Sequence, residues 1–322
     1  MRYDMSKNIT QAALSVLSLV LNPRLLVVQG LVGIFLCVNF LMIFTFFKKE
    51  AFRSNMRYIF FAHTLFCDTL FLAISDALLV IVFSRTPMPA GVCMVVYGFS
   101  SMLNFATPLT LTAMCVERYV AICMPLRHAE IATPRRATGC VFVIHALSSV
   151  MQVAIFSMVV SSAPAGFYAA PLDCSVEQLV AVRWQQDLRS ALSQLYFLLM
   201  SITIAFTYFR IMAAARAASA DDRKSSAKGL RTVLLHAFQL FLCLLVLWVP
   251  LIETAVREVN FTVFLQLRYI DYVAFILAPR CLSPLVYGLR DEKFFQVLKS
   301  YALFQCYKTL PPTKIFSISE KS

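Results

Sequence analysis

Residues 92–127 read VCMVVYGFSSMLNFATPLTLTAMCVERYVAICMPLR. The first 25 of them, 92–116, are mostly apolar and carry no charged side chain. A helix needs about 20 such residues to cross a bilayer core of roughly 30 Å. From Cys93 to Arg118, at about 1.5 Å per residue, a helix would span roughly 37 Å, so these two residues would lie at opposite membrane interfaces. The stretch therefore predicts a long transmembrane helix.

Six further stretches have a similar length and composition, and they lie at residues 25–47, 58–83, 138–160, 191–209, 233–252 and 269–289. Only 14% of the chain is charged, whereas soluble domains carry about 25% charged residues. The length of the stretches and the lack of strict alternation indicate helices rather than strands. We expect an all-α membrane protein: a seven-transmembrane-helix bundle over 25–289, between an N-terminal segment, 1–24, and a tail, 290–322.

The tail begins with a pattern that predicts a short eighth helix. Residues 291–302 alternate polar and apolar positions as an amphipathic helix on a membrane surface would. Phe294, Phe295 and Leu298 are expected to face lipid.

The distribution of basic residues predicts the orientation. With the N-terminus outside, 20 of the 29 Lys and Arg residues lie on the inner side and 8 on the outer, and Arg280 lies within the last helix. This is the positive-inside bias of membrane proteins, so the net charge of +12 does not indicate nucleic-acid binding. The N-glycosylation sequons at Asn8 and Asn260 both fall on the outer side in this topology.

Cysteine positions add an independent expectation. Of ten cysteines, most fall within helices or on the inner side, where a small buried hydrophobe is the ordinary role. Cys93 and Cys174 fall on the oxidising outer side, Cys174 in the loop that follows residues 138–160. We predict a disulfide between them, which would hold that loop over the mouth of the bundle.

The run MCVERYVAICMPLR at residues 114–127 resembles the signature of odorant receptors within the rhodopsin-like family of G-protein-coupled receptors. Glu117, Arg118 and Tyr119 match a motif shared by the whole superfamily, with Glu117 in place of the more usual Asp. The continuation VAICMPLR is much more specific to odorant receptors. The resemblance implies that Glu117 holds Arg118 in the inactive state and that Arg118 turns toward the G protein on activation.

Further segments resemble switch elements of the same family. PRCLSPLVYGLR at residues 279–290 is similar to the Asn-Pro-x-x-Tyr segment and is especially like fish odorant receptors, with Ser283 where the Asn usually stands. Pro284 permits a helix bend there. The remaining positions that the resemblance assigns to switching are Tyr287, Trp248, Pro250, Tyr208 and His236.

Asp68 lies near the middle of the second predicted helix. A carboxylate there costs about 2.5–3.5 kcal/mol on insertion scales, so it should face the interior and have partners. Asn39 and Arg280 are the candidates, and an Asp68–Arg280 pair would offset two such costs. The family pattern makes Asp68 the sodium-linked acid, but that pair would disfavour a sodium ion. We expect no other cofactor and no metal, because the histidines at 63, 128, 145 and 236 lack metal-ligand spacing.

A ligand pocket is expected between the outer halves of the helices, lined by apolar residues and a few polar groups. The polar candidates are Ser100, Ser101, Asn104, Tyr196, Glu253 and Asp271. No Asp lies in the outer third of residues 92–116, so the arrangement of amine receptors is absent. Glu253 and Asp271 would receive a cationic ligand or, alternatively, are solvated charges at helix ends.

These patterns predict a plasma-membrane odorant receptor of olfactory sensory neurons. It would bind a small extracellular molecule and activate a stimulatory or olfactory-type G protein, raising cyclic AMP. A non-olfactory rhodopsin-like receptor for a lipid, peptide or metabolite is one alternative, which Trp248 leaves open. A transporter or channel is another, although Asp68 and Arg280 alone do not make a continuous polar path. Enzymatic activity is not expected, because the chain has no Gly-rich phosphate loop.

Overall fold

The computed structural model describes residues 23–84, 86–164, 166–174, 179, 182–218, 238, 241, 245, 248–281 and 294–300. Five helices in these ranges are long and apolar enough to cross a membrane. They are α2 (Pro23–Lys48), α4 (Met56–Phe83), α5 (Ala90–Cys123), α7 (Pro134–Ser162) and α9 (Arg183–Ala218). The predicted helix at 233–252 lies largely outside the described residues.

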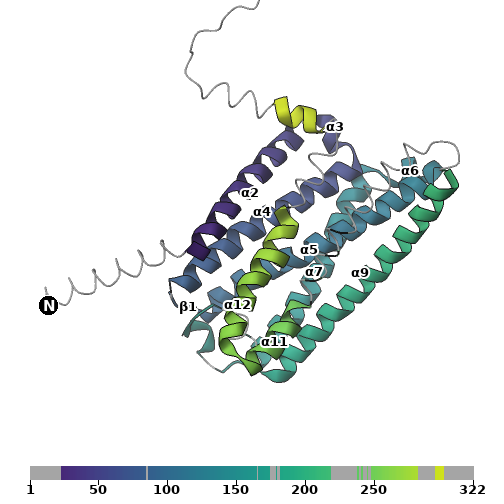
Figure 1. Ribbon diagram of the computed structural model, residues 1–322. Coiled ribbons are helices and arrows are strands. Elements are labelled where there is room, and N and C mark those ends of the chain that lie inside the picture. The colour runs from purple at the N-terminus through teal and green to yellow at the C-terminus, as the bar shows by residue number, and fades with distance from the viewer. Residues whose placement is uncertain are drawn as a thin grey trace, which may run out of the picture.

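The long helices lie side by side in one bundle (Figure 1). Helix α5 is central and packs against α4, α7 and α9, while α2 packs on α4. The short helices α3 (Glu50–Arg53) and α6 (Pro125–Ile131) lie at one end, which we call the Arg118 end. The opposite end, called the Cys93 end, holds the small antiparallel pair of β1 (Met88–Pro89) and β2 (Pro171–Leu172).

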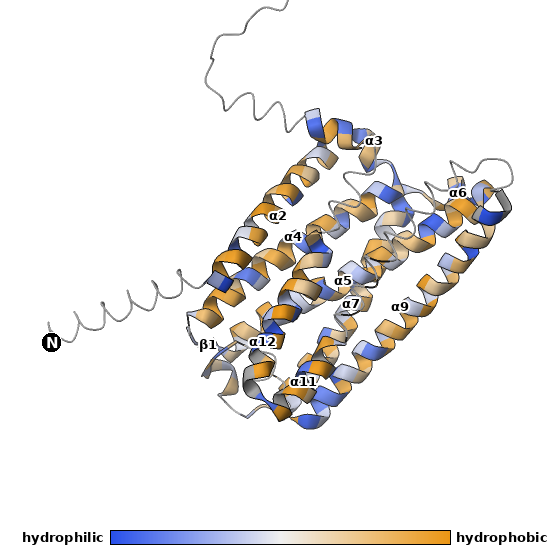
Figure 2. Ribbon diagram, viewed as in Figure 1, coloured by the Kyte–Doolittle hydropathy of each residue, from blue (hydrophilic) through white to orange (hydrophobic). Residues whose placement is uncertain are grey.

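Hydrophobic residues predominate along the long helices (Figure 2), and many of their side chains are exposed. Phe142 and Phe209 are each 70% exposed, and Phe40 is 61% exposed. Soluble monomers rarely expose such extensive apolar surface, because water disfavours it. This surface is therefore suited to contact with lipid.

The helices extend beyond the stretches that hydropathy marks. Helix α7 begins at Pro134, four residues before the predicted 138, where Thr133 caps it by accepting from the Arg136 amide and Pro134 occupies the first turn. Asn55 caps α4 in the same way, by accepting from the Arg57 amide at 3.0 Å. Hydropathy reports the part that suits lipid, whereas capping residues set the ends.

The helical segment that leads into the predicted stretch at 269–289 begins before residue 269. Helix α11 (Val249–Val259) is followed after Asn260 by α12 (Phe261–Asp271), and a π-helical turn, η2 (Tyr272–Leu277), continues it. The helical segment therefore begins at Phe261, before the predicted stretch that starts at residue 269, just as α9 begins before its own stretch. Pro279 follows the π-helical turn, and its missing N–H and its ring disfavour an ordinary α-helical turn before it.

Residues 294–300 are helical and lie at the Arg118 end, as Figure 1 shows beside α3. Phe294 is 1% exposed and packs against Phe52, Tyr58 and Phe61. The expectation that Phe294 faces lipid is therefore wrong, because this ring completes the core where α3 meets α4. Phe295 is exposed, as predicted.

Candidate functional site

A carboxylate at the Arg118 end has two basic partners. Glu117 lies near the end of α5 and is 8% exposed. Its Oε2 is 3.3 Å from Nε of Arg118, the next residue along the chain. Its Oε1 is 3.3 Å from Nε2 of His128, which α6 supplies. The carboxylate therefore holds Arg118 and α6 together, and the part played by His128 was not foreseen from the sequence.

One aromatic contact and one hydrogen bond near this carboxylate join α5 to α9. Tyr119 packs against Phe206 with ring centroids 5.8 Å apart. The thiol of Cys123 donates to the backbone carbonyl of Arg210. Tyr208 lies on the same part of α9, in edge contact with Phe209. These contacts connect α9 to the part of α5 that also carries Glu117 and Arg118.

A second polar site lies in the middle of the bundle. Asp68 is fully buried on α4, and its Oδ1 is 3.2 Å from Nε of Arg280, which is 4% exposed. Thr107 of α5 donates to the same oxygen at 2.8 Å. The predicted Asp68–Arg280 pair is thus formed, and each charge has its counter-charge within a medium that penalises either alone.

The guanidinium of Arg280 has further partners on three sides. It donates to Oδ1 of Asn104 at 2.7 Å and to the carbonyl of Ile276 at 3.2 Å. Its carbon lies 3.6 Å from the ring centroid of Phe71, a cation–π contact. Because this fixed cation lies against Asp68, a sodium ion there would meet a like charge, so the site does not fit sodium well.

Asn39 does not join this site. It is fully buried on α2, and neither its amide nitrogen nor its oxygen has a hydrogen-bond partner within the part of the chain that is described. Arg280, the other expected partner, and Thr107 approach Asp68 from elsewhere in the bundle and bond to its carboxylate.

A small cavity adjoins Arg280, where α5 faces η2 and the residues that follow η2. Asn104, Pro108 and Pro279 line it together with Thr107, Phe275, Ile276 and Arg280. Its volume of about 10 Å³ is room for one water molecule. Pro108 lacks the amide that would bond the carbonyl of Asn104, four residues earlier in α5. The cavity therefore adjoins an interrupted turn of α5.

The six residues expected to contact a ligand do not converge on one cavity in the described ranges. Ser101 accepts from Gln152 of α7 at 2.7 Å, and Tyr196 donates to the Leu147 carbonyl at 2.6 Å. Asn104 binds Arg280, as described above. Glu253 lies 3.9 Å from Arg268, and Ser100 and Asp271 are buried. Most of these polar groups join neighbouring helices, and ligand contact by them stays a prediction.

The expected switch residues are only partly described. Trp248 precedes α11 and makes an edge contact with Phe197, with ring centroids 5.8 Å apart. Pro250 lies in the first turn of α11. Asn260 caps α12 by accepting from the Val263 amide. The remaining predicted residues, His236, Ser283, Pro284, Tyr287 and Asn8, lie outside the described ranges.

The predicted disulfide is present at the Cys93 end. Cys93 and Cys174 are bonded, with Cα atoms 5.5 Å apart. The segment before Cys174 contains η1 (Phe167–Ala169) and β2, and β2 pairs with β1 just before α5. This segment is thereby tied to the start of α5 both covalently and by backbone hydrogen bonds.

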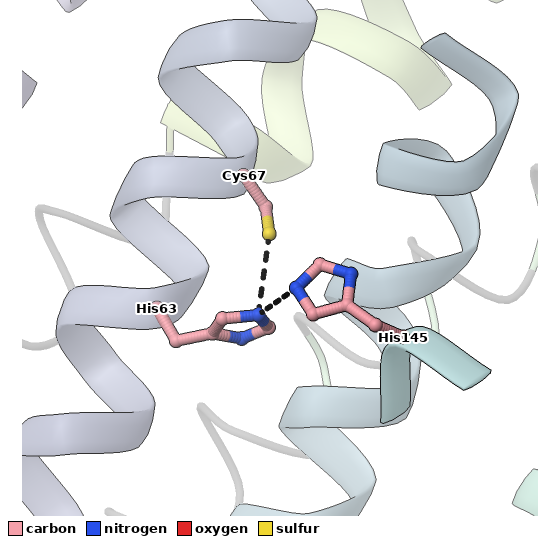
Figure 3. Close-up of side chains that lie close together, drawn as sticks. All are labelled: His63, Cys67 and His145. Atoms are coloured by element: carbon pink, nitrogen blue, oxygen red, sulfur yellow. Dashed lines mark hydrogen bonds between the residues drawn. The ribbon is translucent and has the colours of Figure 1, made fainter. Parts of the chain in front are cut away.

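Packing creates one further polar cluster that no sequence pattern indicated. His63 and Cys67 of α4 meet His145 of α7 (Figure 3). The sequence carries little signal for it, because His145 lies 82 residues from His63 and on another helix.

Comparison with known proteins identifies the family of this chain. The family model described as "7 transmembrane receptor (rhodopsin family)" matches residues 38–287. Odorant receptor 131-2 of Danio rerio is 42% identical over 291 residues, which cover 90% of this chain and 89% of that receptor. Galanin receptor 2a of Danio rerio is 27% identical over 235 residues, covering 67% of this chain and 59% of its own length. The chain therefore belongs to the rhodopsin family of seven-transmembrane receptors, a family of receptors and not of enzymes.

Proposed function

We propose that this receptor detects a small odorant molecule and activates a stimulatory or olfactory-type G protein, so that cyclic AMP rises. The observation that carries the proposal is the 42% identity to an odorant receptor over nine tenths of the chain. The continuation VAICMPLR after Tyr119 supports it from within the sequence.

In this proposal the Cys93 end faces outward and the Arg118 end faces the cytosol. The bias of Lys and Arg supports this orientation, as does a disulfide at the side where oxidation occurs. Asn8 and Asn260 would then be available to glycosylation. The helix at residues 294–300 would lie at the cytosolic membrane surface, with Phe294 anchoring it to the bundle.

The coupling step begins at Glu117. Its carboxylate holds Arg118 and His128, and this arrangement corresponds to an inactive receptor. A ligand that binds the active arrangement more tightly shifts the equilibrium toward it. Arg118 then leaves Glu117, and the space beneath it admits a segment of the G protein. The Asp68–Arg280 pair keeps α4 and the last helix in register during this change.

Ligand-evoked cyclic AMP tests the proposal in cells that carry the receptor with a stimulatory-type G protein. Amino acids, amines, bile acids, steroids and prostaglandins form the screen. We expect a response that Arg118→Ala abolishes at equal surface expression, while Arg135→Ala, a matched change on the same side, keeps it. An N-terminal epitope read on intact cells tests the orientation in the same samples.

Two outcomes would favour other functions. A response to a peptide or lipid only, with expression outside sensory tissue, would favour a non-olfactory receptor of the same family. Surface protein that responds with no G protein but moves a solute in liposomes would favour a transporter.

A further inference from the structure

The cluster of His63, Cys67 and His145 lies where α4, α5 and α7 meet. His63 and Cys67 are four residues apart, one turn of the same helix, so both point to the same side of α4. Nε2 of His63 is 2.9 Å from Nε2 of His145 and 3.5 Å from Sγ of Cys67. The three atoms lie within 4.8 Å of one another, and Figure 3 shows them converging on one point.

The hydroxyl of Thr110 fixes the protonation of His63. Thr110 of α5 donates its only hydroxyl hydrogen to the carbonyl of Ala106 at 2.7 Å. It therefore accepts from Nδ1 of His63, which lies 3.0 Å away. The proton of neutral His63 is then on Nδ1, and the lone pair of Nε2 points at Cys67 and His145. A second ring nitrogen held in this way is typical of histidines that bind metals.

We propose that His63, Cys67 and His145 form a binding site for one thiophilic metal ion, and that monovalent copper fits it best. Two imidazole nitrogens and a thiolate suit Cu⁺ and Zn²⁺, the soft and borderline ions of protein sites. Metal bonds of about 2.0–2.3 Å would place the ligand atoms roughly 3.5 Å apart. Two observed separations, 2.9 and 3.5 Å, are close to this value, and all three atoms lie within 4.8 Å of one another, so rotation of the side chains is enough to surround an ion.

Charge selects between the two ions. On binding, the thiol of Cys67 releases its proton to solvent and its sulfur bonds the metal, with no change of oxidation state. His145 takes the tautomer with its proton on Nδ1, so that its Nε2 bonds the ion as well. With Cu⁺ the resulting complex is neutral, whereas Zn²⁺ leaves a charge of +1 within the membrane, which is costly. The neighbouring carboxylate of Asp68 is paired with Arg280 and is directed to another site.

The number of ligands points the same way. Zinc in structural sites is almost always bound by four ligands. The cluster has three in the described part of the chain, and the adjacent Thr110 is already bonded to His63 and to Ala106. A bound ion would join α4 to α7 one helical turn from Asp68, and it would thereby stiffen the bundle beside the central ion pair.

The test is Cu⁺ binding to the purified full-length receptor, with a chromogenic chelator as the competitor and ascorbate to keep copper reduced. We expect one equivalent of tightly held Cu⁺ that is lost in Cys67→Ser and retained in Cys140→Ser, a matched change of a free cysteine on α7. Thr110→Val should weaken binding by about 10–100-fold, as loss of a supporting hydrogen bond does at other metal sites. The X-ray absorption spectrum should show one sulfur and two nitrogen ligands.

Each other outcome would overturn a part of the proposal. Equal Cu⁺ binding by the wild type and Cys67→Ser would mean that the cluster is only a hydrogen-bonded clamp between helices. Displacement of copper by equimolar Zn²⁺ would overturn the choice of the monovalent ion. Size-exclusion elution and the melting temperature of metal-free Cys67→Ser show whether this variant is folded. If it is not folded, His145→Gln replaces it, and the same loss of Cu⁺ binding is expected.

Discussion

Two polar clusters lie within one turn of each other on α4, and they hold the bundle in different ways. Asp68 pairs with Arg280, so each charge would be costly without the other. His63, Cys67 and His145 are joined by hydrogen bonds (Figure 3), and an imidazole or a thiol has a neutral form that needs no counter-charge. Charged groups in a membrane must find a partner, whereas neutral polar groups gain little by doing so. The first cluster should therefore dominate stability, and the second leaves room for another role.

The largest effect is expected from Asp68→Ala, which leaves the buried guanidinium of Arg280 without its counter-charge. Breaking such a pair from one side costs about 3–5 kcal/mol. Surface expression and the melting temperature of the purified receptor should both fall sharply. Adding Arg280→Met to Asp68→Ala removes the orphaned charge and should recover much of the loss. If the double variant is no more stable than the single one, the ion pair is not what holds this region.

A smaller effect is expected from His145→Phe in the absence of metal. The change removes the bond to His63 and keeps an aromatic ring between α4 and α7. Interhelical hydrogen bonds in membranes contribute about 0.6 kcal/mol on average and up to about 1.7. A double-mutant cycle of His63→Phe and His145→Phe should give a coupling within this range. A coupling as large as that of Asp68 and Arg280 would remove the distinction between the two clusters.

The smallest effect is expected from Gln152→Leu. Gln152 donates to Ser101, but its own buried carbonyl oxygen has no partner in the residues described. Loss of a neutral bond of about 1 kcal/mol is then offset by removal of an unsatisfied buried group. The melting temperature should change little, and Gln152→Glu, which buries a charge instead, serves as the contrasting control. A strong destabilisation by Gln152→Leu would show that neutral bonds matter more here than we infer.

The same distinction explains which features could be predicted from the sequence. Asp68 and Arg280 are charged residues among apolar neighbours. Because a buried charge needs a counter-charge, the sequence alone predicted that they pair. The disulfide followed equally directly, because Cys93 and Cys174 were the two cysteines placed on the oxidising side. The five described spanning helices were each predicted, although their ends were set by caps such as Thr133 and not by hydropathy.

Neutral polar residues were harder to place. Ser101 and Tyr196 bond to α7, which their sequence positions did not indicate, and their contact with a ligand stays a prediction. Position along a helix gives the depth of a side chain in the membrane. It does not say whether the neighbour it faces is a cavity or another helix, because that depends on how both helices are rotated. The roles of His128 and His145 depended on such packing too.

The connection between α11 and α12 has a mechanical consequence. Asn260 is the single residue between the two helices, and its side chain caps the second of them. A connection of one residue has few rotatable bonds, so it is a stiff hinge and not a flexible linker. A tilt of α11 is then transmitted as torque to α12, whose continuation carries Arg280. Inserting a few glycines at this connection would let α11 and α12 move independently, even though no group that binds a ligand or a G protein had been changed.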